Sequence, residues 1–323
     1  MSIEVDIPAA PWTGRTDGSG SEHLRWHQAV RPYDPAERES RCVLIGFASD
    51  EGVNRNKGRT GAAAGPDALR GALSSMALPD PIVLEDAGTI AVTDADLDGG
   101  QARLGRAVAA AINDGRLPVV LGGGHEVAYG TYRGVAAART RADRPRLGIL
   151  NLDAHFDLRA DPVPSSGTPF RQILEAEQAA GTDCRYDVLG ISQPSNTRAL
   201  FDTAKRLGVR YLIDDRCGVT DSDQVDTFVA ALVDSVDQIY LTIDLDVLPA
   251  AVAPGVSAPA AYGVPLETIQ RVCDRVTESG KLIAVDVAEL NPAFDIDNRT
   301  ARTAARLIHR IVTRHRLPHV ESA

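Results

Sequence analysis

Long apolar runs are missing from this sequence, and none approaches the roughly 18 residues that a membrane-spanning helix needs. A signal-like start is missing as well. Basic residues are in the minority, since 34 Lys and Arg stand against 44 Asp and Glu, and the formal net charge is -10. This acidic balance argues against nucleic acid or an anionic membrane as a general partner. We therefore expect a cytoplasmic protein.

Cysteine is scarce, with 4 residues in 323. Cys42, Cys184, Cys217 and Cys273 are widely spaced and form no Cys-x-x-Cys pair. In a reducing compartment we expect buried free thiols at these positions, although the spacing alone leaves disulfide pairing open.

The chain also lacks internal repeats, low-complexity tracts and Pro/Gly/Ser-rich linkers, while its 44% hydrophobic residues suffice for one large core or for two domains. We expect a single domain over residues 1–323. Residues 1–40 are polar and are predicted to form an N-terminal extension packed on that domain, near the functional site.

Apolar strand-like runs alternate with helix-like ones, which is typical of βα units around a parallel sheet. The predicted strands are 42–47, 81–84, 117–121, 147–151, 186–190, 209–213, 239–243 and 282–286. Helices are predicted after Gly65-Pro66 and over 101–113, 126–140, 170–180, 222–235, 265–278 and 298–314. The pattern alone fits both an open α/β sheet and a TIM barrel, because eight such strands also close a barrel.

The run 151–159 places Asp153, His155 and Asp157 at alternate positions directly after a strand-like segment. Side chains two apart share a face of an extended chain, so these three project together. Burying them without a cation or several hydrogen bonds would be costly. The pattern therefore indicates a metal site, and the alternative for this run alone is a solvated polar loop.

Three further strand-like runs also end in chemically active side chains. Asp244 and Asp246 follow 239–243, His125 follows 117–121 after three glycines, and Asp286 and Glu289 lie at the end of the last predicted strand. In an open parallel sheet the carboxyl ends of the strands border the ligand crevice, so these segments can converge. The glycines are also compatible with a phosphate cradle, but they lack the Lys-Ser/Thr ending of a P-loop.

A set of two imidazoles and four carboxylates holds too many acids for one cation. Two divalent ions bridged by carboxylates would neutralise them. The oxygen-rich shell without thiolates suits manganese better than a structural zinc. The set consists of His125, Asp153, His155, Asp157, Asp244 and Asp246.

These motifs resemble those of the ureohydrolases, the arginase and agmatinase superfamily, over nearly the whole chain. The matching strings are Gly122-Gly-Gly-His125, Asp153-Ala-His-Phe-Asp157 and Asp244-Leu-Asp246. Longer strings are most similar to the formimidoylglutamase branch; they are Trp12-Thr-Gly-Arg15, Arg25-Trp-His-Gln28, Gly52-Val-Asn-Arg-Asn-Lys-Gly-Arg59, Asp153-Ala-His-Phe-Asp-Leu-Arg159 and Ser165-Ser-Gly-Thr-Pro-Phe170. The resemblance implies an open three-layer αβα sandwich with a mostly parallel eight-stranded sheet, rather than a barrel.

The resemblance also implies two Mn²⁺ per subunit and assigns their ligands. His125 and Asp157 would bind one ion, His155 and Asp246 the other, and Asp153 and Asp244 would bridge the pair. A metal can lower the pKa of a bound water towards ~7, so the implied nucleophile is hydroxide and not a side chain.

The implied reaction is hydrolysis of N-formimidoyl-L-glutamate to L-glutamate and formamide in histidine degradation. Glu289 would hold the cationic end of the substrate, or else be an ion-paired carboxylate. Arg159 and Ser166 would contact a substrate carboxylate, and the residues of a loop characteristic of the branch, Arg55, Asn56 and Arg59, would assist. For each loop arginine the alternative is a solvated charge.

One departure concerns proton transfer. Arginases carry a histidine shortly after the Asp-x-His-x-Asp motif, and this chain has Phe170 there, so Asp157 or a metal-bound water is the expected donor to the leaving amine. Glu126, where many relatives have Ser or Thr, also fits the formimidoylglutamase branch, but the sequence assigns it no role.

Other functions stay open at this stage. The same centre could act on agmatine or guanidinobutyrate, or the chain could be a non-catalytic metal-binding relative. The expected partner is a small acidic amidine, with neither nucleic acid nor membrane, and a homo-oligomer is among the assemblies that relatives form.

Overall fold

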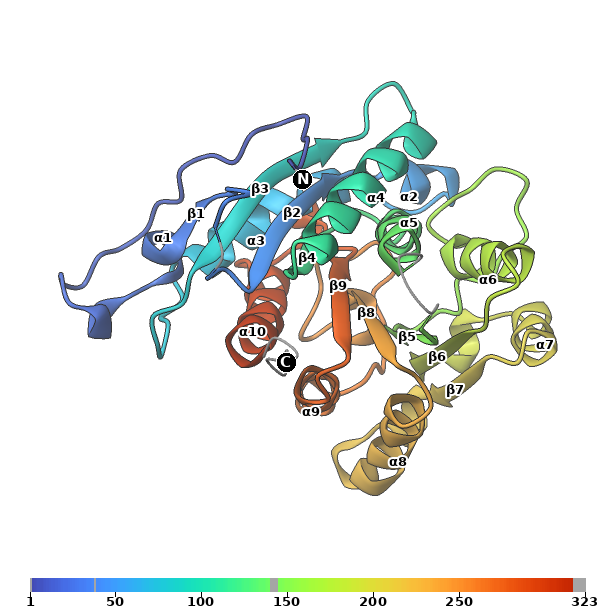
Figure 1. The fold of residues 1–323 in the computed structure, drawn as a ribbon. Helices are drawn as coiled ribbons and strands as arrows, with labels where there is room; N and C mark the ends of the chain where they lie inside the picture. Colours follow the sequence, from blue (N-terminus) through green and yellow to red (C-terminus); the bar gives the residue numbers. More distant parts are fainter. Residues whose placement is uncertain (1, 38, 140–144, 316–323) are drawn as a thin grey trace.

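Nine parallel strands form one open sheet in this computed structural model, which describes residues 2–37, 39–139 and 145–315 (Figure 1). The strands are β1 (Val30–Pro32), β2 (Cys42–Ala48), β3 (Leu84–Ala91), β4 (Leu117–Leu121), β5 (Leu147–Leu152), β6 (Cys184–Ile191), β7 (Arg210–Ile213), β8 (Gln238–Asp244) and β9 (Leu282–Ala288). Their order in the sheet is β1-β3-β2-β4-β9-β8-β5-β6-β7. In the described part of the chain β1 and β7 each pair on one side only, so the sheet is open and the barrel is excluded.

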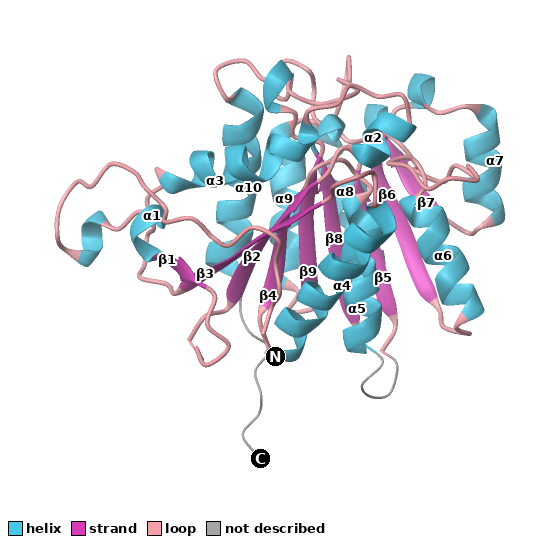
Figure 2. Ribbon diagram, turned by 90° about the horizontal axis from the view of Figure 1, so that it is seen from above, coloured by secondary structure: helices cyan, strands magenta, loops and turns pink. Residues whose placement is uncertain are grey.

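Helices cover both faces of the sheet, as the three-layer prediction requires (Figures 1 and 2). One core packs the sheet against α3 (Gly65–Ser74), α8 (Ser222–Val233), α9 (Leu266–Glu278) and α10 (Arg299–Arg314). The other packs it against α4 (Leu97–Asn113), α5 (Val127–Arg139), α6 (Pro169–Ala179) and α7 (Arg198–Arg206). Successive strand residues serve opposite cores, since Ile239 and Leu241 face the first and Tyr240 the second. This alternation explains why the central strands are apolar throughout.

Besides α7, two short helices and one short strand were not predicted. They are α1 (Trp26–Ala29), α2 (Glu51–Arg55) and the edge strand β1, which brings the strand count to nine instead of eight. The strand β1 has three half-buried or exposed residues and ends in proline, so it carries no apolar pattern that a sequence could reveal. The helix α7 was missed for a similar reason, because Ala204 is its one buried residue.

The prediction of a strand at 81–84 was wrong in position, because β3 begins at Leu84. The strand contains Glu85 and Asp86, both about 1% exposed. These two charged residues interrupt the apolar pattern by which a buried strand is predicted. Glu85 is tolerated in the sheet because Arg116 lies 3.2 Å from it and is itself buried.

The described part of the N-terminal segment packs along the β3 edge and beside α3 and α10. Ile7 forms an antiparallel bridge with Thr89, and the Trp26 indole donates to His309 on α10. None of its described residues lines the acidic cavity presented below.

All four cysteines lie in the described residues and are free. Cys42, Cys217 and Cys273 are buried and Cys184 is half-buried, as expected for reduced thiols. No helix among the described ranges combines the length and the apolar character that crossing a bilayer would demand.

Candidate metal centre and cavity

The ends of four strands bring the predicted ligands together. The strands β4, β9, β8 and β5 are neighbours in the sheet, and all run in the same direction. Their carboxyl ends carry, in that order along the edge, His125, Glu289, the pair Asp244 and Asp246, and the trio Asp153, His155 and Asp157. Segments more than 100 residues apart in the sequence therefore meet at one place.

His125 is the centre of the first group. Its Nδ1 lies 2.9 Å from Asp157 Oδ2, 3.1 Å from Asp244 Oδ2 and 3.2 Å from Asp153 Oδ2. The imidazole is 1% exposed, and Nδ1 has no hydrogen-bond partner among the described residues. A nitrogen lone pair surrounded by three carboxylate oxygens is the donor arrangement that a divalent cation uses.

His155 is the centre of the second group. Its Nδ1 lies 3.0 Å from Asp246 Oδ2 and 3.5 Å from Asp153 Oδ1. The two groups, His125 with Asp153 and Asp157, and Asp153 with His155 and Asp246, each place their ligand atoms within 4.8 Å of one another. Asp153 belongs to both, with one oxygen facing each imidazole, which is the geometry of a bridging carboxylate.

The electrostatics of the cluster favour a cation. Burial raises the pKa of Asp157 and of Asp244, and the neighbouring acids raise both further. Burial by itself would lower the pKa of His125, but the carboxylates around it raise that pKa well above its ordinary value. The acids that would hold a proton on Nδ1 would equally hold a metal ion there, and two divalent cations would offset the four negative charges.

Hydrogen bonds fix the orientation of the ligands. The Asp153 carboxylate accepts two hydrogen bonds from residues of its own segment, one from His155 N at 2.6 Å and one from Asn151 Nδ2 at 2.9 Å. The other ring nitrogen of His125, Nε2, lies 3.0 Å from Thr242 Oγ1. Such outer contacts orient the ring so that Nδ1 faces the acids.

Two residues of the site have left-handed backbone conformations, Asp157 with φ 49° and Glu289 with φ 71°. For non-glycine residues this costs on the order of 1 kcal/mol or more and persists where the surroundings enforce it. Both residues follow the end of a strand, and the positive φ turns the chain so that the side chain joins the cluster.

A cavity of about 200 Å³ opens onto the cluster. Of the predicted substrate residues, Asn56, Arg159 and Ser166 line it, together with Glu289. The lining that the sequence did not reveal consists of Gly58, Ser195, Asn196, Leu200, Ser257 and Ala258. Leu200 belongs to α7 and Ser195 to a single 3-10 turn, and the other four lie in loops. No periodicity marks a loop position as facing a ligand.

Arg55 and Arg59, for which contacts with substrate were predicted, are not among the described residues that line the cavity. The Arg55 guanidinium donates to Glu51, to Pro164 O at 3.1 Å and to Ala95 O at 2.8 Å. Arg59 donates to the carbonyls of the 256–257 loop and lies 4.1 Å from the Phe294 ring centroid. Both guanidinium groups hold loops together, which a sequence cannot distinguish from binding a ligand.

Glu289 and Phe170 flank His125. Glu289 Oε1 accepts from His125 N at 2.9 Å, its Oε2 accepts from Ser257 Oγ at 2.5 Å, and burial raises its pKa. Phe170 is fully buried, with its ring 5.3 Å from that of His125 and stacked on Tyr186. At this position the chain therefore places an apolar aromatic side chain beside His125.

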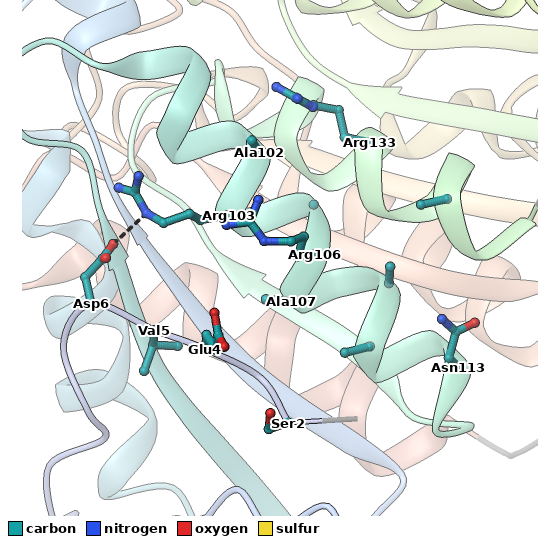
Figure 3. Close-up of a pocket in the computed structure, with 14 residues that line it drawn as sticks. Ser2, Glu4, Val5, Asp6, Ala102, Arg103, Arg106, Ala107, Asn113 and Arg133 are labelled. Carbon is teal, nitrogen blue, oxygen red and sulfur yellow. Dashed lines mark hydrogen bonds and ion pairs between the residues drawn. The ribbon is translucent and has the colours of Figure 1, made fainter.

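A larger cavity, of about 640 Å³, lies elsewhere, between the N-terminal segment and α4 and α5 (Figure 3). Five of its fourteen lining residues are alanines. Figure 3 shows the Arg103 side chain directed at Asp6, which lies 3.2 Å away. In the described ranges both groups of metal-competent side chains lie at the other cavity. The larger of the two cavities is therefore not the candidate functional site. The chemistry of the lining residues identifies the smaller cavity instead.

Comparison with known proteins agrees with this fold and this set of side chains. The model of the Arginase family matches residues 40–313, so the chain belongs to the arginase family. It is a hydrolase of that family, and the relatives below are formimidoylglutamases.

The chain is 70% identical to formimidoylglutamase from Rhodococcus jostii (strain RHA1), over 98% of this chain and 99% of that protein. It is 50% identical to formimidoylglutamase from Ralstonia nicotianae, over 97% of each. Among solved structures, formiminoglutamase from Trypanosoma cruzi with Mn²⁺ matches with a TM-score of 0.74 and 28% identity, over 86% of this chain and 95% of that one. Formimidoylglutamase from Bacillus subtilis shares the fold, with a TM-score of 0.78 at 22% identity over 94% and 93% of the two chains.

Proposed function

We propose that this protein is a binuclear manganese hydrolase that cleaves N-formimidoyl-L-glutamate to L-glutamate and formamide, in histidine degradation. The observation that carries the proposal is one cavity that combines two metal-ligand groups sharing Asp153 with a guanidinium, Arg159, on its wall. The formimidoylglutamase names of the relatives, up to 70% identical over nearly the full length, support the choice of substrate.

In this proposal His125 and Asp157 would hold one Mn²⁺ and His155 and Asp246 the other, and Asp153 and Asp244 would serve both ions. When bound, such a pair supplies Lewis acidity and makes hydroxide available at neutral pH. The set of two nitrogen and several oxygen donors, without thiolate, suits manganese. The T. cruzi formiminoglutamase crystal structure with Mn²⁺ supports this choice of metal.

The charge of the cavity supports an acidic amidine as substrate. Arg159 is the one Lys or Arg among the described lining residues, and it has no ion-pair partner within the ranges that the structure covers. Its aliphatic part lies against Gly167, where a Cβ would stand 2.8 Å from Arg159 Cδ. We propose that Arg159 binds a substrate carboxylate through its planar fork, with the Ser166 hydroxyl and Asn56 beside it.

The other end of the substrate carries positive charge. Glu289, buried in the lining beside His125, would hold the amidinium, since each carboxylate oxygen keeps a further lone pair beyond its present hydrogen bond. With Phe170 in place of a histidine, the Asp157 carboxyl is the proposed proton donor to the leaving amine. Asp157 lines the cavity, as a group that transfers a proton to the leaving amine must.

Agmatine and guanidinobutyrate are the alternative substrates within the same chemistry. Agmatine carries positive charge at both ends, so an unpaired Arg159 at the cavity wall disfavours it. A non-catalytic role would leave the shared ligand cluster and its buried charges unexplained.

A steady-state assay of the purified, manganese-loaded protein tests the proposal. We expect turnover of formimidoylglutamate, with kcat/KM at least about 100-fold above that for agmatine, because agmatine has no carboxylate for Arg159 to bind and that interaction is worth ~3 kcal/mol. Arginine and guanidinobutyrate carry one carboxylate each, and we expect both to be poorer substrates than the dicarboxylate. Preference for any of the other three would assign a different substrate. Absence of turnover with all four would favour the non-catalytic reading.

A further inference from the structure

The segment 49–61, which contains α2, spans the ends of the neighbouring strands β4 and β9 and supplies Asn56 and Gly58 to the cavity. Within this segment only Glu51–Arg55 form a helix, so contacts with the rest of the protein must fix the position of the segment. The first of these contacts is to the residue directly after the ligand His125.

Glu126 is that residue, and it is fully buried. Its Oε1 accepts two hydrogen bonds from the segment, from Ser49 Oγ at 2.7 Å and from Gly52 N at 2.9 Å. A third bond joins the same two stretches, since Gly124 N donates to Ser49 O at 2.9 Å. One carboxylate oxygen therefore ties the start of the segment 49–61 to the turn that carries a metal ligand.

Glycines make room for this carboxylate. A Cβ on Gly52 would stand 2.5 Å from the Glu126 carboxylate, and one on Gly124 would collide with Glu126 Oε2. A Cβ on Gly123 would collide with the Ser49 carbonyl. The run Gly122-Gly-Gly124 therefore allows close approach of another part of the same chain, which accounts for it without a phosphate.

The far end of the segment 49–61 is fixed near Glu289. Asn291 Nδ2 donates to Arg59 O at 3.0 Å and to Thr60 O at 2.9 Å, and the Arg59 guanidinium donates to the carbonyls of Val256 and Ser257. The Ser257 hydroxyl in turn donates to Glu289. Between the two anchors, Asn56 Nδ2 donates to Ser166 Oγ at 3.1 Å.

We propose that Glu126 is a positioning residue for substrate binding: through Ser49 and Gly52 it holds the segment 49–61 so that Asn56 presents Ser166 to the carboxylate of the substrate. Glu126 does not line the cavity and belongs to neither group of metal-competent side chains among the described residues. This inference rests on the proposed function for the identity of the substrate. The anchoring itself rests on the hydrogen bonds alone.

The test compares Glu126→Ala with Glu126→Gln. The alanine variant removes the acceptor of both hydrogen bonds, whereas the glutamine variant keeps an amide oxygen that can accept them. For Glu126→Ala we expect KM for formimidoylglutamate to rise about tenfold with kcat changed less than about twofold, because uniform binding is lost. For Glu126→Gln we expect KM within about threefold of the wild type.

Two further readouts separate positioning from general damage. Manganese content should stay at the wild-type level in both variants. Amide hydrogen exchange of residues 49–58, followed by mass spectrometry, should accelerate in Glu126→Ala and not in Glu126→Gln. The matched control is Glu177→Ala, which removes another buried carboxylate that accepts a hydrogen bond, from Tyr132, and that does not line the cavity. It should lower stability without changing KM or the exchange of residues 49–58.

Unchanged KM and unchanged exchange in Glu126→Ala would overturn the inference. Loss of manganese with a fall in kcat and a constant KM would also overturn it, because Glu126 would then act through His125. If Glu126→Ala does not fold, Ser49→Ala removes one donor only and should raise KM by a smaller factor. If the wild type does not hydrolyse formimidoylglutamate the proposed function fails, and the exchange and metal measurements still decide the role of Glu126.

Discussion

Arg159 carries much of the proposed specificity at the scale of single residues. Arg159 is the one Lys or Arg among the described residues that line the cavity, and buried acids line the same cavity. A charged hydrogen-bonding pair with a carboxylate is worth about 1.5–3 kcal/mol. Its planar fork suits a carboxylate better than a lysine ammonium does.

We expect Arg159→Ala to raise KM for formimidoylglutamate by about 10- to 150-fold with little change in kcat, which corresponds to losing that interaction. Arg159→Lys should recover only part of the loss, because it keeps the charge and not the fork. The control is Arg106→Ala, which removes an exposed arginine at the larger cavity on α4. An unchanged KM in Arg159→Ala would remove this residue from the binding site.

The residue scale also shows what the sequence could and could not reveal. The alternation of Asp153, His155 and Asp157 was visible because a strand fixes which side chains share a face. Ser257 and Asn196 were not visible, because loop residues have no period. Asn196, for example, bonds Phe156 N and Ala154 O, and only the folded loop shows that it supports the ligand segment.

At the scale of elements, β3 shows that the position of a buried strand cannot always be predicted from apolar runs in the sequence. Its Asp86 is 1% exposed and accepts from Arg70 Nε at 2.8 Å, from Arg70 Nη2 at 2.9 Å and from Trp12 Nε1 at 2.9 Å. A strand with paired, buried charges looks polar in sequence. It was therefore predicted three residues early, at the apolar residues 81–84.

We expect Arg70→Met to destabilise the protein by about 3–5 kcal/mol, because it leaves the buried Asp86 without its cation. Urea unfolding followed by circular dichroism measures this. The double variant Arg70→Met with Asp86→Asn should recover part of the loss. Arg103→Met breaks the more exposed pair with Asp6 and should cost at most about 1 kcal/mol. If Arg70→Met and Arg103→Met lose the same free energy of unfolding, the buried Arg70–Asp86 pair does not have the importance that we assign to it.

The contact between α1 and α10 should make stability depend on pH. His309 Nδ1 accepts from the Trp26 indole at 2.9 Å, so that nitrogen must be unprotonated in the folded state. Burial lowers the pKa of His309 below its ordinary value of 6.5, and the positive charge of Arg306 lowers it further. The unfolded chain therefore binds a proton at a higher pH than the folded one does, and stability falls as the pH decreases below about 6.5.

The measurement is the free energy of unfolding in urea between pH 8 and pH 5.5, for the wild type and for His309→Gln. We expect the wild type to lose more stability over this range than the variant does, because glutamine has no proton to gain. His23→Gln, at an exposed position, should keep the wild-type slope. Identical slopes in the wild type and in His309→Gln would show that this histidine does not contribute.

At the scale of the whole molecule, the sequence indicated parallel βα units but not the order of the strands. Eight apolar runs fit a barrel as well as an open sheet, and the resemblance to a family selected the open form. The order β4-β9-β8-β5 depends on which strands pair across long stretches of chain, and no local pattern records it. That order is nevertheless what gathers the six predicted ligands.

Because the ligands come together only in the folded chain, metal binding must stabilise the fold. A cation that binds the native state alone adds about 4 kcal/mol at a concentration 1,000 times its Kd. We therefore expect Mn²⁺ to raise the Tm of the wild type and a chelator to lower it.

Asp153→Ala removes the carboxylate common to both groups, so it should show no such shift in Tm. It should also retain little manganese by elemental analysis and lose activity by more than about 100-fold. The exposed Asp161→Ala, in the loop beyond the motif, should behave as the wild type does. A wild-type Tm shift in Asp153→Ala would mean that the ion binds elsewhere, and the convergence of the four strand ends would then need another explanation.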